Sequence, residues 1–570
     1  MNTSGRIRSL LFFSTLLLPT LALFLFLFSS LGLVARPRHY AATLQTLPLH
    51  IHRRHLHEEI ARSHCEGTLY PELCVSTVAS FPDLASKSVP QVIAATLNLT
   101  MGEVKVANSN CSIIERSWIK RLGPLERRAL DDCQELFQET MDEFRNALSD
   151  LSGTPSASKH FHDLQTLLSG AMTNQYTCLD GFAYSKMNVR NQIEKGLKKI
   201  SNHLSNSLVM LKKIPGANKT RTSEVFPEYG SLRHGFPSWI STKNRKLLQT
   251  STNATKYNLI VAQDGTGNFT NINDAVAAAP NSSTTRFVIY IKAGAYFENV
   301  EVVSKKTNLM FLGDGIGKTW VKGNRNVVDG WTTFRSATVA VVGSGFIAKG
   351  ISFENYAGPE KHQAVALRSG SDLSVFYQCS FIGYQDTLYV HSLRQFYREC
   401  DIYGTVDFIF GNAAVVIQMC NLYARKPNQN QKNMFTAQGR EDPNQNTGIS
   451  ILNCKVTAAA DLIPVKSSFK NYLGRPWKEY SRTVFMKSYI DDLVDPAGWL
   501  EWDGDFALST LYYGEYMNRG PGSNTSARVT WPGYRVINDS TEASQFTVES
   551  FIQGTQWLNA TGVNHYPGLS

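Results

Sequence analysis

The chain has 570 residues, of which 42% are hydrophobic and only 18% are charged, so it has ample apolar surface for large folded cores. This composition excludes a globally disordered, collagen-like or coiled-coil protein, and the length predicts more than one domain. The net charge is +10, from 57 Lys and Arg against 47 Asp and Glu. Such a mild positive charge suits an acidic polysaccharide as partner and does not indicate nucleic-acid binding.

The chain starts with an apolar stretch from Leu10 to Val34 that contains no charge and has arginines on both sides. It is long enough to cross a bilayer, whereas the apolar part of a secretory signal is usually shorter. We therefore expect residues 1–35 to be a long signal peptide or an uncleaved signal anchor, and the only part of the chain that contacts a membrane. Later Asn-x-Ser/Thr sequons, such as Asn98 and Asn281, are consistent with a glycoprotein of the secretory pathway.

The next two segments differ in their apolar pattern. Residues 36–59 are rich in Arg and His and have no apolar period, which predicts a solvated stalk; a metal-binding tract is the alternative. From 60 to 211, apolar residues recur at spacings of three and four, for example Leu197, Ile200 and Leu204. This period predicts an all-α helical bundle.

The 9 cysteines are too few for a disulfide scaffold, and none lies in a CxxC motif, so zinc-binding and thioredoxin-like sites are not indicated. In an oxidising compartment some of them should pair. In the helical half, Cys65 and Cys74 can close a short hairpin. Cys133 and Cys178 can join two helices, which would leave Cys111 unpaired, although spacing alone does not fix the connectivity.

Residues 212–255 contain several prolines and glycines and a basic cluster, a composition typical of an exposed linker. The cluster ends in Arg245, Lys246, Leu247 and Leu248. A dibasic site on an exposed linker of the secretory pathway invites proteolysis, so we predict a processing site here. A merely solvated run of charge is the alternative.

Residues 256–570 consist of short β-rich runs separated by Gly, Asn and Asp. Four similar segments align on Cys379, Cys400, Cys420 and Cys454; the first three are spaced by 21 and 20 residues, and the fourth follows after 34, as if one loop were longer. A period of about 20 residues without intervening helices predicts an all-β parallel β-helix, in which every coil adds one strand to each sheet; a β-propeller or a sandwich fits less well. Equivalent cysteines would then stack, and we expect Cys400 to bridge to Cys420 in the next coil.

Two aspartates follow these cysteines at the same offset, Asp386 after Cys379 and Asp407 after Cys400. Because neighbouring coils lie about 4.8 Å apart, the two carboxyl groups should be stacked on one face. One should then keep its proton near neutral pH while the other stays anionic, which supplies an acid and a nucleophile. An aspartate stack that faces water or binds calcium is the alternative.

Four more side chains complete a candidate site. Gln363 and Gln385 carry amide donors of the kind that stabilise an oxyanion, although each can equally make a core or turn hydrogen bond. Arg475 can hold one carboxylate ionised through a forked pair, and Trp477 offers a flat face to a sugar ring.

These residues lie in long motifs that resemble those of the plant pectin methylesterases. The likeness extends over essentially 256–565, and the family's fold is a right-handed parallel β-helix. The matching stretches include Gly358–Leu367, Gly383–Tyr389, Gly404–Gly411 and Leu473–Trp477.

The helical half resembles the pectin methylesterase inhibitor domain that precedes many of these enzymes, in Ala129–Leu136 and Ala171–Gly181. The segment Arg245–Leu248 is similar to the processing motif between the two regions. The resemblance implies a pro-region that restrains or chaperones the enzyme until a subtilisin-like protease removes it.

The resemblance also implies an activity, the removal of methyl esters from homogalacturonan in the cell wall. Asp407 would attack the ester carbonyl and form an acyl-enzyme, and Gln385, helped by Gln363, would stabilise the oxyanion. Asp386 would protonate the departing methanol and then activate water. Arg475 would orient Asp407.

By the same resemblance, Trp477 lines a sugar subsite and Thr338 is a further substrate contact. No metal or organic cofactor is implied, and separate pectin methylesterase inhibitor proteins are possible partners. Two other functions stay open at this point: a glycoside hydrolase that cleaves the same polymer, since paired carboxylates also serve that reaction, and a non-catalytic inhibitor that uses the helical half.

Overall fold

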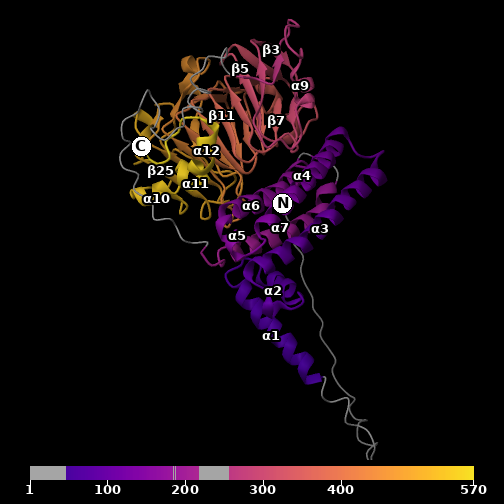
Figure 1. Cartoon of the computed structure of the whole chain (residues 1–570). Helices are drawn as coiled ribbons and strands as arrows, with labels where there is room; N and C mark the ends of the chain where they lie inside the picture. Colours follow the sequence, from indigo (N-terminus) through magenta and orange to yellow (C-terminus); the bar gives the residue numbers. More distant parts are fainter. Residues whose placement is uncertain (1–46, 184, 186–187, 217–255, 570) are drawn as a thin grey trace, which may run out of the picture. The chain divides into compact units, whose positions relative to one another are not determined.

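The computed structural model describes residues 47–183, 185, 188–216 and 256–569 (Figure 1). The apolar N-terminal stretch and the expected processing site at Arg245–Leu248 lie outside these ranges. The chain divides into two compact units, Met1–His55 and Leu56–Ser570, and the second unit holds both the helical region and the β-rich region. No helix within the described ranges is both long and apolar enough to cross a membrane.

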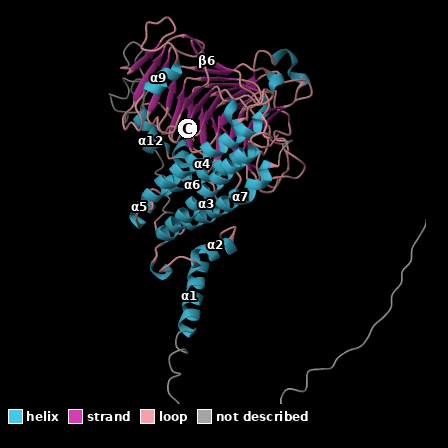
Figure 2. Ribbon diagram, turned by 90° about the vertical axis from the view of Figure 1, so that its right-hand side faces the viewer, coloured by secondary structure: helices cyan, strands magenta, loops and turns pink. Residues whose placement is uncertain are grey.

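The described residues from 47 to 216 are mainly helical, as the apolar period of 60–211 predicts (Figure 2). Its long helices pack in the pairs α4–α6, α3–α7, α6–α7 and α3–α4 and bury their apolar faces together. Helix α1 begins at Leu47, inside the segment 36–59, whose role as a stalk stays a prediction. The helices are α1 (Leu47–Cys65), α2 (Pro71–Ala79), α3 (Val89–Trp118), α4 (Pro124–Asp150), α5 (Thr154–Lys159), α6 (Phe161–Asp180) and α7 (Val189–Leu211).

Local chemistry fixes the ends and connections of these helices. At the start of α3 the side chain of Gln91 accepts a hydrogen bond of 2.8 Å from the amide of Ser88, as in a capping box. Both disulfides that the sequence suggested are present, Cys65–Cys74 and Cys133–Cys178. Cys111 is buried and free, as expected.

The second region is a parallel β-helix of three sheets, in which strands from successive coils pair in parallel. The first sheet contains β1 (Leu259–Val261), β2 (Phe287–Ile291), β5 (Leu309–Gly313), β8 (Ile347–Lys349), β11 (Ser374–Tyr377), β14 (Arg394–Arg398), β17 (Ala414–Gln418), β20 (Gly448–Leu452), β23 (Arg482–Met486), β25 (Tyr512–Tyr516) and β26 (Tyr534–Val536). The second contains β4 (Val300–Val302), β7 (Val339–Val341), β10 (Leu367–Ser369), β13 (Leu388–Val390), β16 (Ile409–Gly411), β19 (Asn433–Gln438) and β22 (Asn471–Gly474). The third contains β3 (Gly294–Phe297), β6 (Thr319–Gly323), β9 (Ser352–Asn355), β12 (Ser380–Ile382), β15 (Asp401–Gly404), β18 (Asn421–Ala424), β21 (Lys455–Ala458) and β24 (Tyr489–Ile490).

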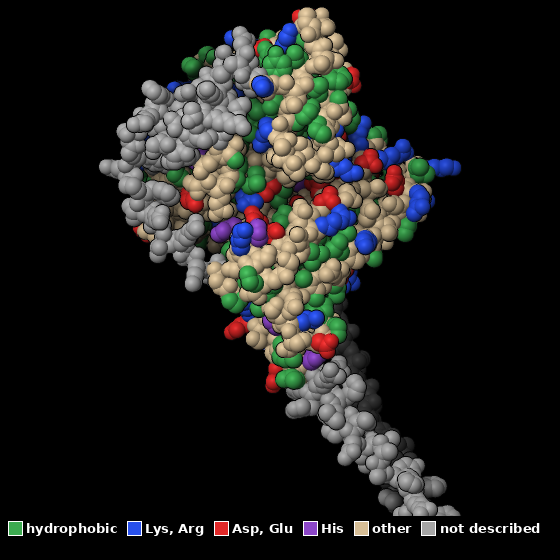
Figure 3. All heavy atoms as spheres, viewed as in Figure 1, with side chains coloured by type: hydrophobic (Ala, Val, Ile, Leu, Met, Phe, Trp, Pro, Cys, Tyr) green, Lys and Arg blue, Asp and Glu red, His purple; other side chains and the backbone are tan. Residues whose placement is uncertain are grey.

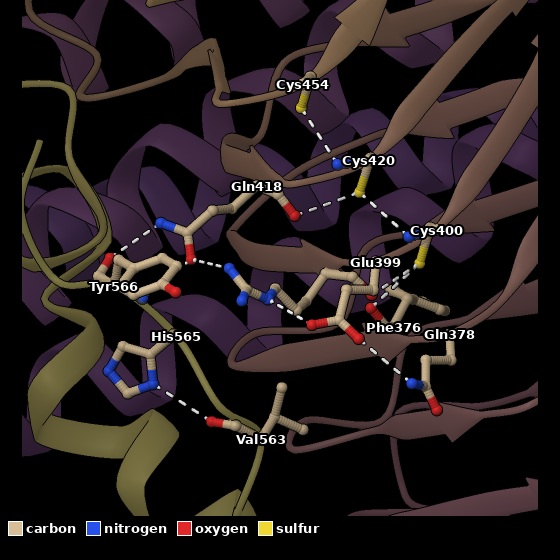
Figure 4. Close-up of polar contacts among 11 residues, drawn as sticks. Phe376, Gln378, Glu399, Cys400, Gln418, Cys420, Cys454, Val563, His565 and Tyr566 are labelled. Carbon is tan, nitrogen blue, oxygen red and sulfur yellow. Dashed lines mark hydrogen bonds and ion pairs between the residues drawn. The ribbon is translucent and has the colours of Figure 1, made fainter. Parts of the chain in front are cut away.

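Short helices lie beside this coil. They are α9 (Ile272–Ala278), α10 (Ser540–Ser544), α11 (Val548–Ile552) and α12 (Gly554–Thr561). Near the C-terminus the side chain of Gln418 binds both backbone groups of Tyr566, the carbonyl and the amide, each at 2.9 Å (Figure 4). This pair of bonds holds the C-terminal segment against the first sheet.

The aligned cysteines form a buried ladder in the core, but the predicted Cys400–Cys420 disulfide is absent, because both thiols are free (Figure 4). The amide of Cys400 instead donates to the sulfur of Cys420 at 3.3 Å, and the amide of Cys420 to that of Cys454 at 3.4 Å. Side chains on paired parallel strands lie about 4.8 Å apart, whereas a disulfide needs Cβ atoms about 3.8 Å apart. In-register stacking therefore brings these cysteines into line without bonding them.

Charge on the described surface is mixed. On the face shown in Figure 3, Lys and Arg side chains are interspersed with Asp and Glu. The positive net charge therefore does not gather there into one continuous basic patch.

Candidate active site

Asp386 and Asp407 occupy matching positions in adjacent coils. Strand β13 pairs with β16 so that Leu388 lies opposite Ile409, and each aspartate comes two residues before its strand residue in this pair. The amide of Asp386 donates to the carbonyl of Val406 at 3.0 Å, which fixes the two turns to each other. The two aspartates therefore lie at matching positions in adjacent coils, as the cysteine repeat predicted.

Both aspartates have left-handed backbone conformations, with φ of 62° at Asp386 and 52° at Asp407. Non-glycine residues rarely adopt such values, although aspartate tolerates them better than most. Other corners of the coil have the same backbone, for example Gln378, Glu399 and Met419, so the two aspartates occupy equivalent corners of successive coils.

The two carboxyl groups differ in their electrostatic surroundings. Asp386 is 7% exposed and Asp407 is 6% exposed. Arg475 forms a bidentate ion pair with Asp407, in which Nε donates to Oδ1 at 2.8 Å and Nη2 donates to Oδ2 at 2.7 Å. Burial, and then repulsion from Asp407, raise the pKa of Asp386 well above its usual value, against a smaller opposing effect of Arg475. The two surroundings therefore differ: burial favours the protonated form of Asp386, whereas Asp407 lies in an ion pair with Arg475.

A cavity of about 790 Å³ is lined by Gln385 and Val406, the residues that precede Asp386 and Asp407, while the two aspartates are not among its lining residues. Gln363, Gln385 and Arg475 all line it, so three of the expected side chains converge there. The Oε1 atom of Gln385 is buried and has no hydrogen-bond partner among the described residues. A buried amide with an unsatisfied end is suited to binding a polar group of a ligand.

Trp502 also lines the cavity and was not predicted from the sequence. The guanidinium carbon of Arg475 lies 4.3 Å from the centre of its ring. Its indole is 37% exposed, as an aromatic surface for a sugar would be. Nothing in its local sequence connects it to the aspartates, because only the coiling of the chain brings it beside them.

Two predicted substrate contacts lie elsewhere. Trp477 does not line the cavity and packs edge-on against Phe410, with ring centroids 5.9 Å apart. Thr338 is fully buried, and its hydroxyl donates to the backbone carbonyl of Glu354 at 3.0 Å. Their roles as substrate contacts stay predictions.

Potential metal ligands do not gather at this site. Across the described part of the chain, one group of acidic and histidine side chains is close enough to hold an ion, and it lies in the helical region. It consists of Asp150, His160 and Asp163.

Family comparisons agree with this geometry. The pectinesterase family model matches residues 258–555, and the plant invertase/pectin methylesterase inhibitor model matches residues 59–210. The matched ranges contain the paired aspartates and the long helices respectively.

Individual proteins are similar over both regions. "Probable pectinesterase/pectinesterase inhibitor 39" of Arabidopsis thaliana is 58% identical over 487 residues, which cover 84% of this chain and 90% of that protein. "Pectinesterase 3" of Citrus sinensis is 51% identical over 522 residues, which cover 90% of this chain and 89% of that protein. The solved structure of a pectin methylesterase from carrot has a TM-score of 0.55 and 61% identity, and the match covers 55% of this chain and 98% of that one. The β-helix, the buried aspartate pair and these matches together show that the chain belongs to the pectinesterase family, with an inhibitor-like helical region before the enzyme domain.

Proposed function

We propose that Asp407 is the nucleophile and Asp386 the acid and base with which this pectinesterase removes methyl esters from homogalacturonan. The observation that carries the proposal is the unequal pair, in which Arg475 binds one carboxylate while burial favours the protonated form of the other. An anion beside a proton donor is what ester cleavage through an acyl-enzyme requires.

The reaction then has two stages. The Asp407 carboxylate attacks the ester carbonyl carbon, and the tetrahedral intermediate collapses as Asp386 gives its proton to the departing methanol. Asp386, now a carboxylate, takes a proton from the water that attacks the resulting anhydride. Breakdown of that second intermediate restores ionised Asp407 and protonated Asp386 and releases the galacturonate acid.

The negative oxygen that forms in both stages needs a donor. Gln385 and Gln363 line the cavity beside the aspartates, and amide N–H groups there would stabilise that oxygen. A hydrolase that cleaves the polymer chain, the alternative weighed from the sequence, has no comparable use for this amide pair, and the family match favours the esterase.

The test is substitution of the nucleophile in the full chain. Asp407→Ala should abolish methanol release from methylated pectin while the unsubstituted chain releases methanol without shortening the polymer. Asp401→Asn is a matched control on the same coil. The Asp401 carboxylate accepts a hydrogen bond of 2.8 Å from the side chain of Asn421, and Asp401 does not line the cavity. Undiminished methanol release by Asp407→Ala, or rapid depolymerisation by the unsubstituted chain, would refute the proposal.

The helical region restrains the enzyme domain in this proposal. Asp132 of α4 pairs with Arg335 at 2.8 Å, and Asp180 of α6 pairs with Lys478 at 2.9 Å, close after Arg475 in the chain. Such contacts support a restraint that cleavage of the chain before the β-helix would release. Cleaving the purified precursor before Leu259 should raise the rate of methanol release, and an unchanged rate after the helical region has been removed would contradict the restraint.

Secretion to the cell wall, with processing by a subtilisin-like protease, completes the proposal. It rests on the apolar N-terminal stretch, the sequons and the dibasic site in the sequence. N-terminal sequencing of the exported protein should find a start just after Leu248. A mature protein that still begins before the helical region would rule the processing step out.

A further inference from the structure

The outward face of the second sheet carries a row of side chains that the helical region covers. Ala340, Arg368, Tyr389 and Phe410 lie at matching positions in β7, β10, β13 and β16. The apolar and aromatic members of this row pack into the same hydrophobic cluster as the long helices. Arg368 is therefore a cation in an otherwise apolar surface, beneath the helical region.

This row runs alongside the catalytic cavity. The cavity is lined by Gln363, Gln385 and Val406, which precede β10, β13 and β16 and so come from three successive coils. A polymer bound there would run along the axis of the β-helix, across coils that lie about 4.8 Å apart. Arg368 follows Gln363 on one coil, and Asp386 lies on the next.

The ring of Tyr389 links Arg368 to the catalytic acid. Burial raises the pKa of Tyr389 above its usual value, and among the smaller effects Arg368 lowers this pKa while Asp386 raises it. Both charged groups therefore lie close to the same phenol. When the ester of one sugar unit lies at Asp386, the guanidinium of Arg368 is consequently within reach of a neighbouring unit.

Arg368 is buried but incompletely paired. Its side chain is 1% exposed, and its Nη2 lies 3.5 Å from Oε1 of Glu135 in α4. Its Nε and Nη1 atoms have no hydrogen-bond partner among the described residues, and its guanidinium carbon lies 3.4 Å from the centre of the Phe334 ring. The best partner of a buried guanidinium is a carboxylate that binds two nitrogens at once, as Asp407 does with Arg475. Glu135 supplies only one long contact of this kind.

Helix α4 places a stripe of carboxyl groups against this face. Asp132, Glu135 and Glu139 recur at spacings of three and four residues, so they share one side of the helix, about 5–6 Å apart. Arg335 binds Asp132 at 2.8 Å and Glu135 at 2.6 Å. Burial, and then repulsion from Glu135, raise the pKa of Glu139 to about 8, whereas Arg368 lowers it, so Arg368 lies near this carboxyl group as well. The helix thus presents to two arginines what a polyuronate would present, a row of carboxyl groups.

We propose that Arg368 binds the free carboxylate of a de-esterified galacturonate unit of pectin, at a place that Glu135 occupies while the helical region covers the sheet. A carboxylate makes charge-assisted hydrogen bonds to guanidinium nitrogens, whereas a methyl ester carries no charge and binds them less strongly. This subsite rests on the proposed pectinesterase function, and it adds a preference for esters that lie next to units already de-esterified.

The test measures the binding of trigalacturonate, which contains no ester and therefore reports on the subsite without turnover. The protein is the chain cut before Leu259 and separated from its helical region; the carrot structure, 98% of which matches little more than half of this chain, indicates that the enzyme domain folds without the helices. Calorimetric titration should show saturable binding, and Arg368→Gln should weaken it by about tenfold or more. Fully methylated trigalacturonate should bind both proteins equally. The uncut chain should bind trigalacturonate much more weakly, because the helical region covers Arg368.

Two further variants separate recognition of the carboxylate from loss of the fold. Arg368→Lys keeps a positive charge, so its affinity for trigalacturonate should lie between those of Arg368→Gln and the unsubstituted protein. Arg398→Gln is the matched control, because Arg398 is also buried, at 2% exposed, but binds Glu399 and Gln418 on the first sheet and does not line the cavity. Its affinity should be unchanged, and thermal unfolding checks the fold of each variant. In steady-state assays Arg368→Gln should raise the KM for partly de-esterified pectin and leave kcat unchanged.

Three results would overturn the proposal. The first is no saturable binding of trigalacturonate to the cut protein, and the second is equal affinity of Arg368→Gln and the unsubstituted protein. The third is an equal loss of affinity for methylated and unmethylated trigalacturonate, which would make Arg368 a structural residue. A lack of methanol release would instead contradict the proposed pectinesterase function, since the binding of trigalacturonate does not depend on ester cleavage.

Discussion

Replacing Arg475 by glutamine tests the division of labour between the two aspartates most directly. The guanidinium makes two charge-assisted hydrogen bonds to Asp407, which is 6% exposed. Removing one partner of a buried ion pair costs about 3–5 kcal/mol, because it leaves a buried charge uncompensated. Asp407 in Arg475→Gln can avoid that cost by taking up a proton, and a protonated carboxyl group is no nucleophile.

The expected loss follows from that energy. At about 1.36 kcal/mol for each factor of ten, 3–5 kcal/mol corresponds to a decrease in kcat of roughly 10²–10⁴ at neutral pH. Activity should recover partly as the pH rises, since higher pH ionises the nucleophile again. The kcat of Arg475→Lys should lie between those of Arg475→Gln and the unsubstituted chain, because lysine keeps the positive charge but cannot make the bidentate hydrogen bonds.

The assay is methanol release from methylated pectin over a series of pH values, with kcat and KM determined separately. Thermal unfolding of each variant checks that the fold is kept. Arg519→Gln is the matched control, because Arg519 is exposed and its guanidinium binds a backbone carbonyl of Lys487. A kcat of Arg475→Gln within twofold of the unsubstituted chain across the whole pH series would refute the assignment of Asp407 as the ionised nucleophile.

Three further predictions concern the amide of Gln385, the carboxylic acid of Asp386 and the free cysteines. Gln385→Ala should lower kcat by roughly 10²–10³ with little change in KM, as expected for an oxyanion donor, and steady-state methanol release checks this; a change in KM alone would assign Gln385 to substrate binding. The pKa of Asp386 is raised, and its proton is needed for methanol departure, so the kcat of the unsubstituted chain should fall as the pH rises through that pKa. Asp386→Asn should be inactive at every pH. A pH-independent kcat of the unsubstituted chain in the basic range would contradict the acid role. The unfolded chain should react with a thiol reagent at 5 cysteines, and a loss of two from that count would mean that Cys400 and Cys420 are bonded after all.

The sequence predicted the architecture because the repeat that encodes it is local. Cysteines spaced by 21 and then 20 residues, with short strands between them, are sufficient to indicate successive coils, and the spacing of 34 residues before Cys454 indicates one longer coil. Nearly equal coil length between Cys379 and Cys420 puts equal offsets in register, so the stacking of Asp386 on Asp407 followed from counting along the chain. The helical half was predicted for the same kind of reason, since spacings of three and four residues define one face of a helix.

Only the tertiary structure determined which side chains from different coils contact one another. Trp502 reaches Arg475 from a later coil, and Thr338 is turned into the interior, yet neither outcome leaves a mark in the neighbouring residues. The Cys400–Cys420 bridge failed because a distance between paired strands, rather than a register, decides whether two thiols can bond.

Periodicity along a chain determines which residues share a face. Contacts between faces depend on loop lengths and on side-chain volumes summed over distant segments, and these are settled only when the whole chain has folded.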